Sequence, residues 1–105
     1  MRIINQKEFD NLPLINGVKN APSNAEYLLE EIKCDVIFGN NIVMKSTITR
    51  LRFKGNARFG NNIVLECQCF FKKKVLFGNN TTFQKRLQIK GNARIGNKAI
   101  FHSTT

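Results

Sequence analysis

Few side chains in this chain of 105 residues could perform chemistry. It has one histidine, His102, together with three cysteines and seven acidic residues. A histidine that acts as a general base needs a partner that orients it, and no carboxylate lies near His102 in the sequence. We therefore expect no catalytic residues and no cofactor.

The cysteines also point away from a chemical site. Cys67 and Cys69 form a C-x-C pair, and Cys34 lies far from them in sequence. A zinc site needs three or four ligands, so we expect no metal, with Cys69 in the core and Cys67 near a corner. The N-terminal residues MRIINQKEFDNLP lack the apolar segment of a signal peptide, which predicts reduced thiols and a cytoplasmic protein.

The charge of the chain is strongly positive and unevenly placed. Seventeen Lys and Arg residues against seven acids give a formal net charge of +10. Residues 1–35 hold four basic and six acidic side chains, whereas residues 36–105 hold thirteen basic side chains and one acid. No apolar run approaches the roughly eighteen residues that a membrane span requires, so we expect no membrane association.

An internal repeat predicts the architecture. The tetrad FGNN begins at Phe38, Phe59 and Phe77, and the related IGNK begins at Ile95, at spacings of 21, 18 and 18 residues. Within this repeat, every sixth residue from residue 53 to residue 101 is large and apolar. The series also runs upstream through Ile32, Phe38 and Met44, with one nine-residue step before residue 53. A second column is formed by the residues four positions after each large one, and most of these are small or β-branched. Ile48, four positions after Met44, belongs to this second column.

This period of six is the hexapeptide pattern of a left-handed parallel β-helix, in which three short strands close one triangular coil. We expect about four coils, with the large residues stacked inside and a loop where three residues are added between Met44 and Phe53. The Gly-Asn pairs mark equivalent corners, where left-handed backbone angles are tolerated. A right-handed, bactofilin-like β-helix is the alternative, because its coils are of similar length.

The segment before the repeat predicts a different element. SNAEYLLEEI begins with Ser23 and has Glu26 three residues later, which is the pattern of a helix capping box. We expect residues 1–31 to form an extended lead-in and a capping helix, and residues 32–105 to form the β-helix.

Residues eighteen positions apart occupy the same place on successive coils, which brings basic side chains together. Lys54, Lys72 and Lys90 then form one column, with Arg58 and Arg94 aligned on the same side. Lys73 and Lys74 bring the total on this surface to seven positive charges. Such a surface suits a polyanion such as a nucleic acid, or an acidic protein surface, or serves solubility alone.

The end of the repeat predicts self-association. After Phe101 only His102, Ser103, Thr104 and Thr105 follow in the sequence. These residues cannot cover a core end that contains Phe83, Ile95 and Phe101, and unpaired strand edges are a template for another chain. We expect a homo-oligomer that forms through this end.

The stretch DVIFGNNIVMKSTIT, from Asp35 to Thr49, resembles the start of the C-terminal β-helix of eukaryotic UDP-glucose pyrophosphorylase (UTP–glucose-1-phosphate uridylyltransferase). The likeness continues into FGNNIVLECQ, and KEFDNLPLI is similar to the extended segment that approaches that β-helix, so it covers about residues 7–70. The resemblance to this nucleotidyltransferase family implies that the β-helix serves assembly and regulation of an enzyme and performs no chemistry itself.

The chain also departs from that family. Two regular coils continue from Phe71, and Cys34 and Asp35 stand where the family tends to have Gly-Asp. The chain shows neither a Gly-rich nucleotide loop nor a sugar-binding half. Hexapeptide β-helices also occur in acyltransferases that use a histidine base, but His102 lacks the surroundings for that role. The functional prediction is a non-catalytic assembly or regulatory module, with polyanion binding or a bactofilin-like polymer as alternatives.

Overall fold

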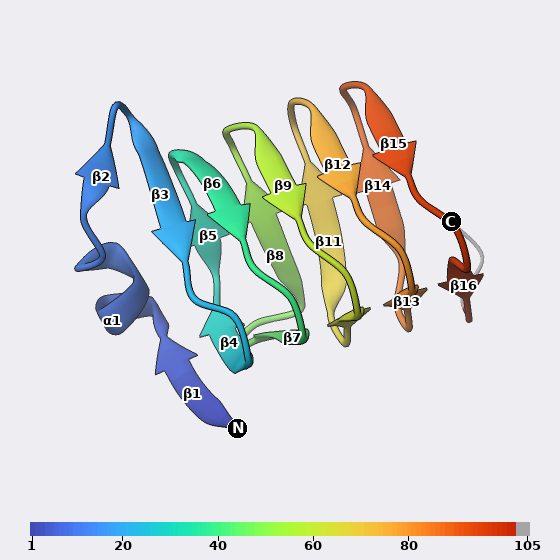
Figure 1. Cartoon of the computed structure of the whole chain (residues 1–105), viewed down its shortest axis with the longest axis horizontal. Helices are drawn as coiled ribbons and strands as arrows, with labels where there is room; N and C mark the ends of the chain where they lie inside the picture. Colours follow the sequence, from blue (N-terminus) through green and yellow to red (C-terminus); the bar gives the residue numbers. More distant parts are fainter. Residues whose placement is uncertain (103–105) are drawn as a thin grey trace.

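The computed structural model describes residues 1–102, and these form a parallel β-helix whose chain winds through three sheets in turn (Figure 1). The first sheet contains, in order, β1 (Arg2–Asn5), β4 (Ala25–Leu29), β7 (Ile42–Ser46), β10 (Ile63–Leu65), β13 (Thr81–Phe83) and β16 (Ile100–Phe101). The second contains β5 (Glu31–Ile32), β8 (Arg50–Phe53), β11 (Gln68–Phe71) and β14 (Leu87–Ile89). The third contains β2 (Leu14–Ile15), β3 (Val18–Ala21), β6 (Asp35–Phe38), β9 (Ala57–Phe59), β12 (Val75–Phe77) and β15 (Ala93–Ile95).

The predicted all-β parallel β-helix is therefore confirmed, with about five turns instead of four. Every strand pair is parallel except β2 with β3. The left hand of the coil stays a prediction. Residues 103–105, which the sequence analysis assigns to the β-helix, lie outside the described residues.

The core is built from stacked side chains, as the hexad pattern predicts. Phe38, Phe59 and Phe77 lie in register on β6, β9 and β12, with centroid distances of 4.8 and 4.9 Å between successive, nearly parallel rings. Phe53 and Phe71 form a second stack at 4.2 Å, and rings of the two stacks meet edge to face. Aromatic contacts of these geometries add to the free energy gained by burial.

The predicted helix over residues 23–31 is wrong, because this segment forms β4 and β5. Ala25, Tyr27 and Leu29 alternate inward along β4, which pairs with β7. Asn24 has a φ of 57°, and the Ser23 hydroxyl accepts a hydrogen bond from the backbone N–H of Asn40, so this pair forms the same corner as the Asn-Asn pairs of later coils. Strands β3, β4 and β5 pair with β6, β7 and β8, so the β-helix begins upstream of Ile32.

The helix of the described chain is α1 (Gln6–Asp10), in the segment that we expected to be extended. Its capping box consists of Asn5 and Glu8, where the Asn5 side chain accepts from the backbone N–H of Glu8 at 2.9 Å. Phe9 of this helix is buried against Tyr27 and Phe38. The helix therefore covers the N-terminal end of the core (Figure 1).

Lys19 on β3 points into this covered end. It is 5% exposed, and its Nζ donates hydrogen bonds to the carbonyl oxygens of Phe9 at 2.8 Å and Asp10 at 3.1 Å. One cation thus binds two carbonyls at the end of α1, which is favourable at a helix C-terminus, and that of Phe9 also accepts from the backbone N–H of Leu12 at 3.0 Å. The Nζ also lies 4.8 Å from the centroid of the Phe9 ring.

The corner between the third and first sheets corrects the role that we gave to the glycines. The left-handed backbone angles belong to the second asparagine of each pair, Asn41, Asn62 and Asn80, and to Lys98 in the last coil, with φ of 58–61°. Glycine is needed for space instead, because a Cβ on Gly60 would lie 2.2 Å from Oδ1 of Asn40.

The predicted loop between Met44 and Phe53 is present between β7 and β8. Ile48 lies in this loop and is 52% exposed, so its assignment to an inward column is wrong. Leu51 takes the inward place, because it pairs in register with Cys69. The three added residues shift the small-residue column by three positions.

Candidate functional site

The corner between the second and third sheets carries a column of four lysines. The last residues of the four strands, Ile32, Phe53, Phe71 and Ile89, lie in register, and a lysine follows each of them. We call the basic corner the set of exposed residues Lys33, Lys54, Lys72, Lys73, Lys74 and Lys90. The repeat predicts all of these on one surface except Lys33, which lies just before the regular part of the repeat. The repeated 21-residue spacing from Lys33 to Lys54 was the signal that could have found it.

Acidic side chains compensate only the N-terminal part of the basic corner. Glu31 lies 4.0 Å from Lys33, 3.5 Å from Lys54 and 3.6 Å from Arg52. Among the described residues, Lys72, Lys73, Lys74 and Lys90 form no ion pair. The positive charge is therefore least compensated over the later coils.

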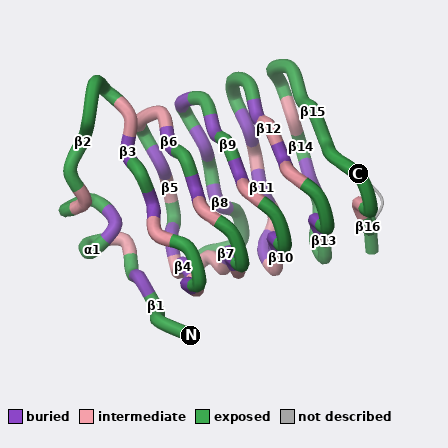
Figure 2. Tube along the Cα trace, viewed as in Figure 1, coloured by how far each residue is buried: buried purple, intermediate pink, exposed green. Residues whose placement is uncertain are grey.

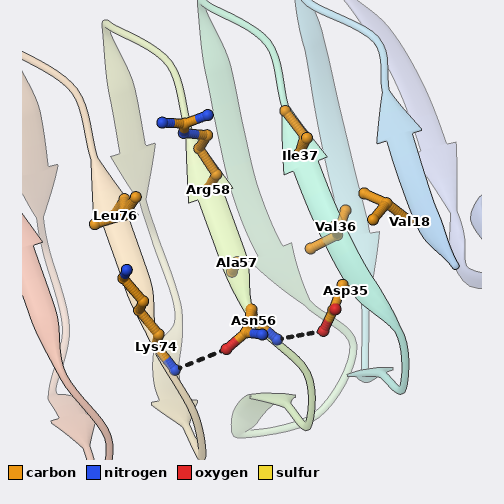
Figure 3. Close-up of a pocket in the computed structure, with 9 residues that line it drawn as sticks. All are labelled: Val18, Asp35, Val36, Ile37, Asn56, Ala57, Arg58, Lys74 and Leu76. Atoms are coloured by element: carbon orange, nitrogen blue, oxygen red, sulfur yellow. Dashed lines mark hydrogen bonds between the residues drawn. The ribbon is translucent and has the colours of Figure 1, made fainter. Parts of the chain in front are cut away.

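The outer face of the third sheet extends this surface with two shallow hollows. In register along β6, β9, β12 and β15, the row of outward residues alternates between apolar and basic: Ile37, Arg58, Leu76 and Arg94. A hollow of about 260 Å³ lies beside Ile37, Arg58 and Leu76 (Figure 3), and a second of about 430 Å³ lies between Arg58 and Arg94.

Backbone contacts order the floor of the first hollow. The N–H of Asn56 donates to Asp35 Oδ1 at 2.8 Å, and the N–H of Lys74 donates to Asn56 Oδ1 at 3.2 Å (Figure 3). The carboxylate of Asp35 is therefore hydrogen-bonded to the backbone. The guanidinium of Arg58 extends over the outer face of the sheet (Figure 3).

The outer face of the second sheet carries an aromatic ring among cations. Phe70 precedes the inward Phe71 and is half-buried on the outside, with Arg50 Cζ 5.4 Å from its ring centroid. Arg52 pairs with Phe70 in register. The sequence analysis assigned most phenylalanines inward and missed this ring, although its place between Cys69 and Phe71 implies an outward direction.

The cysteines occupy the places expected for them. Cys69 lies inside between Leu51 and Leu87, and its Sγ is 3.8 Å from that of the buried Cys67. The contact between the two thiols lowers the pKa of Cys67, while the same contact and burial raise the pKa of Cys69. Within residues 1–102, no three His, Cys, Asp or Glu side chains are placed to hold a metal ion.

The C-terminal end of the described core is open. Phe101 is 50% exposed, although it stacks on the buried Phe83 at 4.6 Å, and Ile95 is 37% exposed whereas Phe77 below it is 5% exposed. Figure 2 shows this change, with buried segments through the middle coils and exposed strands β15 and β16 at the end. His102 is exposed beside this end, and its backbone N–H donates to the Phe83 carbonyl.

No family model matches this chain, and no curated protein or solved structure matches it either. These comparisons therefore add no support to the resemblance of residues 7–70 to UDP-glucose pyrophosphorylase. In the described part of the chain, no helix is long and apolar enough to cross a membrane.

Proposed function

We propose that this chain is a non-catalytic assembly module that associates with a second copy through its last coil. The observation that carries the proposal is the contrast between equivalent residues, since Phe101 is 50% exposed and Phe83, its register partner, is 1% exposed. Full burial of a phenylalanine side chain is worth about 1.5–3 kcal/mol, so covering this end is favourable.

Backbone groups at the same end support the proposal. The strands β14, β15 and β16 each pair on one side only within the described chain. Unpaired strand edges are templates for another strand. Because the N-terminal end is covered by α1, two copies that meet through their last coils form a closed, symmetric dimer rather than a polymer.

The finer functional proposal follows from the resemblance of Asp35–Thr49 to the C-terminal β-helix of UDP-glucose pyrophosphorylase. That resemblance implies a module that assembles or regulates and performs no chemistry itself. The alternative is a bactofilin-like polymer, and the oligomeric state distinguishes it from a closed dimer.

Light scattering across protein and salt concentrations tests the proposal. The net charge of +10 opposes association at low salt, so we expect a dimer that becomes more populated as salt is raised. Phe101→Glu should give a monomer under the same conditions. Ile48→Glu is the matched control, because Ile48 is also an apolar residue, 52% exposed, but lies in the loop before β8.

Hydrogen exchange of the unmodified chain provides a second measurement that does not depend on a variant folding. We expect the amides of β14–β16 to become more protected as protein concentration rises, with no change in β1. A strict monomer at high protein and salt concentration contradicts the proposal. So does a dimer that Phe101→Glu leaves intact, and an open-ended polymer favours the bactofilin-like alternative.

A further inference from the structure

We propose that the basic corner and the arginines beside it bind the backbone of a single-stranded nucleic acid that runs along the axis of the β-helix, with Phe70 as a stacking platform for a base. The proposal does not rest on self-association, because its residues point outward from the sheets; Lys54, Arg58, Phe70 and Lys72 belong to the middle coils, whereas Lys90 and Arg94 belong to the last coil.

The charges of the basic corner are arranged in a line. Successive lysines of the column Lys33, Lys54, Lys72 and Lys90 stand one strand apart, at ~4.8 Å, so the column is on the order of 14 Å long. The two hollows beside it are shallow and open rather than enclosed. A line of cations without an enclosed pocket fits an extended polyanion better than a small anionic ligand.

The basic corner lacks compensating acids over most of its length. Among residues 1–102, Glu31 is the one acid that pairs with cations of the basic corner, and it does so at the N-terminal end of that corner. Lys72, Lys73, Lys74 and Lys90 form no ion pair among the described residues, and Arg58 and Arg94 extend the positive surface onto the third sheet. An anionic partner would relieve the mutual repulsion of this surface.

The side chains that lie among these charges favour a nucleic acid over other polyanions. The surface contains flat and apolar groups as well as charge, since Arg50 lies over Phe70 and Leu76 lies between Arg58 and Arg94. Unpaired bases stack on such groups, whereas an acidic peptide or a sulfated polysaccharide offers mainly charge. In a duplex the bases are already stacked, so a single strand is favoured.

Fluorescence anisotropy with a labelled oligothymidylate of about twenty nucleotides tests the proposal. Four phosphate contacts predict that affinity falls about 50-fold between 50 and 200 mM salt. The variant Lys72→Glu/Lys90→Glu should weaken binding at least 20-fold. The matched control Arg2→Glu/Lys7→Glu changes the net charge by the same amount at the other end of the chain, and its affinity should stay within about threefold of that of the unmodified chain.

Phe70→Leu tests stacking separately, because leucine keeps an apolar side chain without the ring. We expect a loss of about fivefold or more for the oligonucleotide and no change for heparin, which has no bases. Circular dichroism of each variant establishes that it remains folded.

Several outcomes would overturn the proposal. These are no binding at 50 mM salt, an equal loss in both charge-reversal variants, and a duplex or polyglutamate that competes better than the single strand. If Phe70→Leu weakens the binding of heparin and of the oligonucleotide equally, or changes neither, the ring is not a stacking platform and the surface recognises charge alone.

Discussion

The Oδ1 of Asn61 accepts a hydrogen bond of 2.7 Å from the backbone N–H of Asn79, one coil further along the β-helix. The same contact joins Asn40 to Asn61 and Asn79 to Asn97, at 2.7 and 2.8 Å. The second asparagine of each pair forms a parallel ladder, in which Nδ2 of Asn80 donates to Oδ1 of Asn62 at 3.1 Å. The corner is thus stabilised by two columns of asparagine side chains.

Gly78→Ala tests the space that this ladder needs. A Cβ at residue 78 would lie 2.5 Å from Oδ1 of Asn61 and 2.6 Å from the carbonyl oxygen of Gly60. Because one of these atoms belongs to the backbone, the coil itself must shift, and we expect a loss of about 2 kcal/mol or more in urea unfolding. Asn61→Ala removes only the hydrogen bond and should cost about 1 kcal/mol. Equal effects of the two variants would contradict this explanation.

Lys98→Asn should stabilise the last coil. Lys98 has a φ of 61°, in the place where earlier coils have Asn41, Asn62 and Asn80. A left-handed conformation costs an ordinary residue about 1–2 kcal/mol, and asparagine tolerates it better while also offering a side chain to Asn80. We expect a gain of about 1 kcal/mol in the free energy of unfolding. Lys98→Gln removes the same charge without relieving the backbone, so an equal gain there would assign the effect to charge.

Thr81→Val should also stabilise the protein. The Thr81 side chain is fully buried beside Ile63, and its hydroxyl has no hydrogen-bond partner in the described structure. A buried hydroxyl without a partner costs about 1–3 kcal/mol, and valine has nearly the same shape. Thermal unfolding should show a gain of about 1 kcal/mol. Thr82→Val, on the half-buried outer face of the same strand, should change little, and a loss of stability in Thr81→Val would show that the hydroxyl is satisfied.

Tyr27 predicts a loss of stability at high pH. Burial raises the pKa of its phenol, whose hydroxyl donates to the Pro22 carbonyl at 2.7 Å. In the unfolded chain the pKa is about 10, so above that pH the unfolded state releases a proton that the folded state retains. The stability that Tyr27 contributes is therefore present below pH 10 and falls as pH rises above it.

Urea unfolding at pH 9 and pH 11 measures this effect. The difference in stability between the unmodified chain and Tyr27→Phe should shrink between the two pH values, because phenylalanine does not titrate. Lysine titration affects both proteins equally and cancels in the comparison. A difference that is independent of pH would contradict the prediction.

The candidate surface shows how much the sequence could predict. The eighteen-residue spacing placed Lys54, Lys72 and Lys90 in one column, because strand pairing on the next coil follows directly from the repeat. The eighteen-residue spacing misses Lys33, because three residues are added in the loop between β7 and β8 and Lys33 therefore lies 21 residues before Lys54. The outward direction of Phe70 also follows from the sequence, because side chains alternate along a strand and both of its neighbours, Cys69 and Phe71, are assigned inward.

The sequence by itself determined the parallel β-helix, its stacked phenylalanines and its one enlarged loop, because each follows from a local period repeated over several coils. The tertiary structure alone decided the state of residues 23–31. There Ser23 and Glu26 favour a helix locally, whereas Ser23 and Asn24 also complete the corner formed by Asn40 and Asn41. The strand forms because pairing with β7 satisfies its backbone hydrogen bonds and also buries the side chains of Ala25, Tyr27 and Leu29. A short helix at this place could not both pair its backbone with the neighbouring coil and bury these side chains.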